Sequence, residues 1–120
     1  KYYLADLGLR YYLLGQRNVD QGHILENVVY LELIRRGYTV YVGKMGNAEV
    51  DFVTQDQEGE LAYYQVAWTV RGEATLEREL RPLDGITDHY PKYLLTMDLD
   101  PPISHNGIRQ LYALDWLLDA

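Results

Sequence analysis

The segment NAEVDFVTQD (residues 47–56) places a carboxylate in the middle of what reads as a buried strand. Asp51 lies between Val50 and Phe52. Burying a carboxylate costs free energy unless a partner or a ligand compensates for it. We therefore expect Asp51 to belong to a functional site. The alternative is a structural acid that caps a turn or pairs with an arginine.

The segment is the middle strand of a predicted antiparallel meander. Residues 38–44 (YTVYVGK) form the strand before it and residues 61–70 (LAYYQVAWTV) the strand after it, joined by the turns MGN and DQEGE. Strand alternation then places Asp51 and Val53 on one face, and Val50 and Phe52 on the other. In the third strand it groups the following residues on one face: Tyr63, Gln65 and Ala67.

The strongest helix pattern is HILENVVYLELIRRG (residues 23–37). Its apolar positions surround most of the cylinder, which predicts a helix that is mostly buried. Arg35 and Arg36 suit its C-terminal end, and Gly37 suits the stop position. Glu26 lies on the apolar surface of this helix, so it is a second acid in an apolar setting.

The remaining elements complete a mixed α/β (α+β) fold. A helix is predicted over 74–83, where Pro82 should end or kink it, and a short helix with Asp6 as its N-cap is predicted near 9–14. The other predicted segments are a loop at 15–22, strands at 92–97 and 108–114, a loop at 98–107 and a last helical turn at 115–120. The order α-βββ-α-β-β, with that last turn, predicts a mixed central sheet flanked by helices. We expect one domain over 1–120, with 1–20 as an N-terminal extension packed on it.

Composition narrows the class of protein. The 120 residues include no cysteine, which excludes disulfides and thiolate metal sites and favours a cytoplasmic location. No apolar run approaches the roughly 20 residues of a membrane span. The net charge of −7 opposes strong nucleic-acid binding by the domain alone. Because the chain begins with Lys1 and enters apolar sequence at once, we expect a piece of a longer protein.

Three oxygen-bearing side chains can meet if the predicted strands pair. Asp51 and Gln65 are then neighbours, and Glu26 arrives from the helix that crosses the sheet. Two carboxylates and an amide oxygen suit Mg²⁺ or Mn²⁺, so these three residues are the predicted metal ligands. The alternatives are a Glu26 carboxylate bonded to strand backbone and a Gln65 amide that satisfies buried backbone groups.

Several long motifs resemble a known family. The segments GHILENVVYLELIRRGYTVYVGK, EVDFV, YYQVAWTV and YPKYLLTMD resemble the C-terminal domain of uncharacterised prokaryotic P-loop (AAA-type) ATPases. That domain belongs to the PD-(D/E)xK superfamily, so the resemblance implies a restriction-endonuclease-like core. It also implies roles for single residues: Glu26 is the helix acid, Asp51 the strand acid and Gln65 the second-strand ligand. The motif lysine position is filled by Ala67.

The resemblance implies a nuclease-like accessory domain that has lost its catalytic lysine. A displaced lysine is the alternative, with Lys44 as the first candidate and Lys92 as the second; it would give an active Mg²⁺-dependent phosphodiesterase. The implied partner is the ATPase domain of the same chain, which alone would bind ATP. Contacts with a second copy or with nucleic acid are further expectations, in which Arg35 and Arg36 could take part. An oligomerisation module is the third interpretation.

Other motifs give no competing chemistry. His23, His89 and His105 lack metal-ligand spacing and are expected at the surface. Asp98 and Asp100 precede two prolines and are expected to be turn acids. The chain contains no P-loop motif and no G-x-S-x-G motif, so it offers neither a nucleotide-binding loop nor an acyl-transfer nucleophile.

Overall fold

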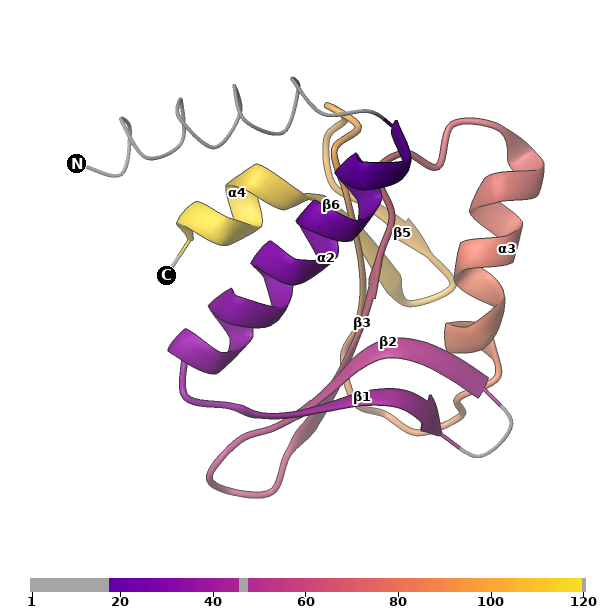
Figure 1. Ribbon diagram of the computed structural model, residues 1–120. Helices are drawn as coiled ribbons and strands as arrows, with labels where there is room; N and C mark the ends of the chain where they lie inside the picture. The colour runs from indigo at the N-terminus through magenta and orange to yellow at the C-terminus, as the bar shows by residue number, and fades with distance from the viewer. Residues whose placement is uncertain (1–17, 46–47, 120) are drawn as a thin grey trace.

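A mixed six-stranded sheet separates two helical layers (Figure 1). The computed structural model describes residues 18–45 and 48–119. The strands follow the order β1-β2-β3-β4-β6-β5, in which β3–β4 and β4–β6 are parallel and the other pairs antiparallel. Their bounds are Thr39–Met45 (β1), Ala48–Gln55 (β2), Leu61–Val66 (β3), Lys92–Thr96 (β4), Ile103–His105 (β5) and Ile108–Tyr112 (β6). The predicted mixed α/β architecture is confirmed.

Three helices are described, one long and two shorter. They are α2 (Asn18–Arg35), α3 (Glu73–Asp84) and α4 (Ala113–Leu118). Helix α2 begins earlier than predicted, because residues 18–22 are helical rather than part of a loop. The short helix predicted near 9–14, and the N-terminal extension as far as residue 17, lie outside the described residues.

Each face of the sheet has its own apolar core. On one face α2 and α4 cover a cluster that includes Phe52, Tyr64 and Leu95. On the other face α3 covers a cluster that includes Tyr63 and Leu94. Adjacent residues such as Tyr63 and Tyr64 therefore bury opposite sides of one strand, as alternation in β3 predicts.

Helix α2 is buried along one side, and not around most of its cylinder as predicted. Leu25, Val29 and Leu33 are fully buried, but Leu31 is 62% exposed and Ile34 46% exposed. The spacing of the three buried residues defines one stripe that faces the sheet, which is the usual pattern of a surface helix. Leu31 and Ile34 project from the other side of the cylinder.

Arg36 is engaged within the fold, and so it is not available for the expected contacts with a second copy or with nucleic acid. Its guanidinium bonds to Glu32 at 2.7 Å and donates to the carbonyl oxygen of Trp116 at 2.6 Å. The same group lies 4.3 Å from the centroid of the Trp116 ring. Arg36 therefore fastens α4 to the end of α2. Arg35 is exposed and also pairs with Glu32.

Strand β5 was predicted as a loop. It pairs with β6 through a two-residue turn in which Asn106 and Gly107 have φ values of 52° and 88°. Positive φ at both central residues is the geometry of a tight hairpin turn, and Asn-Gly is its usual sequence. Other bounds also differ: β3 ends at Val66 rather than residue 70, β6 ends at Tyr112 rather than residue 114, and α3 continues past Pro82 to Asp84.

Among the residues that the structure describes, no helix has the length and apolar character needed to cross a membrane.

Candidate functional site

Asp51 is the extra residue of a β-bulge. The register between β1 and β2 passes from Val42 opposite Phe52 to Gly43 opposite Val50, so Asp51 has no opposite residue in β1. Val50 consequently packs in the same cluster as Val53, and not on the face of Phe52 as alternation predicted. A bulge adds one residue to a strand and redirects its side chain, and such bulges are frequent beside active sites.

Side-chain hydrogen bonds join β2 to β3 beyond the bulge. The backbone register of these strands runs from Gln55 and Leu61 to Phe52 and Tyr64. Past that point the Asp51 backbone N–H donates to Oε1 of Gln65 at 3.0 Å. In return, the Val66 backbone N–H donates to Oδ2 of Asp51 at 2.8 Å. Asp51 and Gln65 are thus the neighbours that the sequence predicted: the Gln65 side chain bonds to the Asp51 backbone, and the Asp51 side chain bonds to the backbone of Val66, the residue after Gln65.

The predicted residues line one open groove. Its volume is about 610 Å³, and its lining includes Glu26 from α2, Asp51 from β2 and Gln65 from β3. Arg78 and Glu79 of α3 line the same groove. Because α2 and α3 cover opposite faces of the sheet, the groove lies at the start of β2 and the end of β3, with α2 on one side and α3 on the other.

The electrostatics of the groove disfavour negative charge on its acids. Burial raises the pKa of Asp51 to about 6 against the hydrogen bond from Val66, and the nearby carboxylates of Glu26 and Glu79 raise it further. The pKa of Glu79 is also raised, chiefly by burial. Like charges that share a site repel, and a proton or a bound cation relieves the repulsion. The groove is therefore an acidic site suited to positive charge.

Glu79 is a residue of the groove that was not predicted from the sequence. Its Oε1 accepts a hydrogen bond from Nε2 of Gln65 at 3.4 Å, so Gln65 bridges β2 and α3. A usable signal existed: Glu79 follows Leu76 by three residues and precedes Leu83 by four, which places it on the apolar side of α3. The same criterion identified Glu26.

The described residues place no lysine in the groove. Ala67, at the motif lysine position, packs against the apolar cluster of the α3 face. Lys92 donates from Nζ to the Asp88 carboxylate and to the Tyr90 carbonyl oxygen, at 3.2 and 3.0 Å, so it is engaged elsewhere. The backbone of Lys44 pairs with Glu49, and its side chain lies outside the described part of the chain.

The described side chains form no closed metal site. Within residues 18–45 and 48–119, no group of three or more His, Asp or Glu side chains could hold a metal ion. Gln65 already uses its oxygen for Asp51. Among the side chains that the structure describes, none donates a hydrogen bond to Oδ1 of Asp51 or to the Glu26 carboxylate. Mg²⁺ commonly binds one or two carboxylates and keeps several waters, which these two acids could provide.

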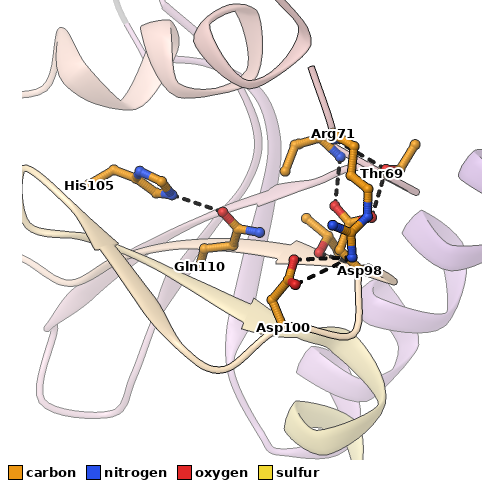
Figure 2. A network of polar contacts seen from close by, with 8 residues as sticks. Thr69, Arg71, Asp98, Asp100, His105 and Gln110 are labelled. Carbon is orange, nitrogen blue, oxygen red and sulfur yellow. Dashed lines mark hydrogen bonds and ion pairs between the residues drawn. The ribbon is translucent and has the colours of Figure 1, made fainter. Parts of the chain in front are cut away.

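A second polar cluster has a structural explanation (Figure 2). Asp98, which was expected to be a turn acid, is buried and accepts hydrogen bonds from Thr69 Oγ1 at 2.7 Å and the Val70 N–H at 2.9 Å. Arg71 approaches Asp98 and Asp100 at 3.3 Å each. These bonds fix the connection between β3 and α3 to the end of β4. His23 and His89 are exposed, whereas His105 is half-buried and bonds to Gln110 at 2.8 Å.

One curated relative matches nearly the whole chain. An uncharacterised protein of Haemophilus influenzae is 39% identical over 118 residues, covering 98% of this chain and 28% of the relative. The chain thus spans little more than a quarter of that protein's length. No family model matches the chain, and no solved structure matches it.

Proposed function

We propose that this chain is a nuclease-like accessory domain, with a restriction-endonuclease-like core, in a longer protein that carries a P-loop ATPase. The observation that carries the proposal is the meeting of Glu26, Asp51 and Gln65 in one groove. They belong to three separate elements and are the residues that the superfamily resemblance assigns. The bulge and the paired side-chain bonds support a site that the fold holds in place, rather than a chance cluster.

We further propose that the groove binds a divalent cation but does not cleave nucleic acid efficiently. Asp51 and Glu26 would hold Mg²⁺ or Mn²⁺, and Gln65 would orient Asp51. When bound, the cation would polarise a phosphate and its own waters. Ala67 can neither orient a water nor offset charge, and losing one such group commonly costs a rate factor of about a hundred or more. Arg78 cannot replace a base, because a guanidinium stays protonated.

The function proposed for such a domain is contact rather than hydrolysis. The ATPase domain of the same chain is the first proposed partner, and the greater length of the Haemophilus relative supports a multidomain setting. Exposed apolar residues on α2 and β1 support contacts with another domain or a second copy: Leu31, Ile34, Tyr41 and Val42.

Calorimetry with Mn²⁺ tests the site, and a cleavage assay tests its inactivity. We expect wild-type protein to give a binding heat at millimolar Mn²⁺ and Asp51→Ala to give none, because Asp51 is the central carboxylate of the groove. Asp84→Ala is the matched control, since Asp84 is an exposed acid of α3 outside the groove lining. Plasmid, linear and single-stranded DNA incubated with Mg²⁺ or Mn²⁺ should stay intact.

Two results would contradict the proposal in different ways. Cleavage by wild-type protein that disappears in Asp51→Ala would establish an active phosphodiesterase, and Lys44→Ala would then show whether Lys44 supplies the missing amine. A wild-type protein that gives no heat with Mn²⁺ would remove the cation site and favour an oligomerisation module.

A further inference from the structure

A second cavity continues the groove past Ala67. Its volume is about 670 Å³, and its lining includes Ala67, Trp68 and Thr69. The two cavities share three lining residues, Val66, Arg78 and Glu79. Arg78 therefore stands at the boundary between the acidic groove and the cavity that contains the motif lysine position.

The guanidinium of Arg78 is available for a ligand. Its side chain is 67% exposed, and its ion pair with the adjacent Glu79 is loose, with Nε 3.9 Å from Oε2. The contrast with Arg36 is direct, since that side chain is only 17% exposed and bonds to Glu32 at 2.7 Å. Arg78 is also the only Lys or Arg among the described side chains that line the groove.

We propose that Arg78 binds a backbone phosphate of a nucleic-acid strand that lies across the two cavities. This inference rests on the proposed nuclease-like function and names the ligand class of its groove. A guanidinium suits the phosphate because its N–H groups can donate to two phosphate oxygens at once. Arg78 thus supplies the positive charge that Ala67 lacks, without supplying a base. A strand is favoured over a lone phosphate because the two cavities adjoin at Arg78.

The neighbouring acids set a condition for binding. Glu26, Asp51 and Glu79 repel a phosphate, and the chain as a whole carries a net charge of −7. Binding should therefore need a divalent cation at the carboxylates and should weaken as salt increases. Without the cation, Arg78 alone faces more negative charge than it can offset.

Fluorescence anisotropy with labelled oligonucleotides tests the role of Arg78. Single-stranded and duplex DNA are titrated with wild-type protein, Arg78→Ala and Arg81→Ala, with Mg²⁺ and with EDTA. Arg81 is the matched control, because it lies on the same helix, is 73% exposed and pairs with Glu77 outside the groove. Both substitutions remove one positive charge from an exposed position of α3, so circular dichroism should show the same fold.

We expect Arg78→Ala to weaken binding about five- to tenfold and to lower the salt slope by about 1, as loss of one phosphate contact predicts. Arg81→Ala should leave both quantities unchanged, and Arg78→Lys should restore part of the affinity. Equal weakening by the two alanine variants would overturn the inference. It would show that Arg78 contributes only one positive charge to the protein, as Arg81 does, and makes no specific phosphate contact. No binding of either DNA by wild-type protein would also overturn it.

Gel analysis of the same samples separates this inference from the proposed function. Cleaved oligonucleotide would contradict the proposed inactivity while the anisotropy comparison of Arg78 and Arg81 still holds. Intact oligonucleotide with no effect of Arg78→Ala would overturn the phosphate contact and leave the accessory-domain proposal standing. Competition by inorganic phosphate as effective as by the oligonucleotide would show that a single anion, and not a strand, is the ligand.

Discussion

Leu94→Ala is expected to lower the free energy of unfolding by about 2–5 kcal/mol, the usual cost of removing a buried leucine side chain. Leu94 is fully buried in the α3-facing core and lies in β4, between β3 and β6. Strands on both sides prevent the cavity from collapsing easily, so we expect the upper part of that range. Urea denaturation followed by circular dichroism measures the change.

Leu99→Ala is the control for this prediction. Leu99 is 69% exposed and lies five positions further along the chain, so its truncation should change the free energy of unfolding by less than about 0.5 kcal/mol. Similar losses in the two variants would show that β4 is not at the centre of the sheet. Leu94 is also opposite Gln65 in the register of β3 and β4, so Leu94→Ala should disturb the groove as well.

Asp51→Asn is expected to stabilise the protein at pH 8, by up to about 3 kcal/mol. The pKa of Asp51 is raised from 3.8 to about 6 in the folded chain, so ionisation is easier in the unfolded state. An asparagine can still accept the hydrogen bond from Val66 and carries no charge. Substitution therefore removes the cost of burying a carboxylate beside Glu26 and Glu79.

The stabilising effect of Asp51→Asn should depend on pH. Below pH 3.8 Asp51 is protonated in both states and contributes little. Between pH 3.8 and about 6 the folded state holds a proton that the unfolded state has lost, so wild-type stability falls as pH rises through this window. The advantage of Asp51→Asn should therefore be small at pH 4 and complete at pH 8, as measured by urea denaturation at each pH.

Asp88→Asn is expected to destabilise the protein at pH 8, which is the opposite of the effect expected for Asp51→Asn. Burial opposes ionisation of Asp88, but hydrogen bonds from Tyr63, the Tyr90 N–H and Lys92 outweigh it and lower its pKa. Its ionised form is therefore stabilising, and Asp88→Asn should lower stability at pH 8, with the loss fading as pH falls through the pKa of Asp88. If Asp51→Asn also destabilised at pH 8, Asp51 would be a structural partner and not a strained site residue.

Much of the fold follows from periodicity in the sequence. The β1–β2–β3 meander was predicted because its strands are long, apolar and separated by short turns. Strand β5 was missed because it has three residues, follows two prolines and is largely exposed, although Asn106 and Gly107 carried the signal for its hairpin. The early start of α2 was missed because residues 18–22 are mostly polar, include a glycine and lack the apolar repeat.

The site was predictable in its parts but not in its geometry. Glu26, Asp51 and Gln65 could be identified because burying a polar side chain costs free energy unless a partner or a ligand compensates for it. The bulge at Asp51 could not be predicted, because strand alternation assumes that every residue is paired. The prediction therefore placed Val50 on the wrong face of β2. The contribution of α3 depends on how this helix, which begins 18 positions after the end of β2, returns to the sheet, and no local pattern in the sequence predicts that.

The bulge also has a thermodynamic consequence. By forcing an ionised Asp51 into a half-buried position, it leaves the empty groove less stable than a neutral one. Any ligand that neutralises the groove removes that cost, and occupancy at a hundred times the dissociation constant adds about 2.7 kcal/mol to stability. Melting temperature thus becomes a readout of what the groove accepts, so a thermal-shift screen of ions and small molecules could find its ligand before any activity is known.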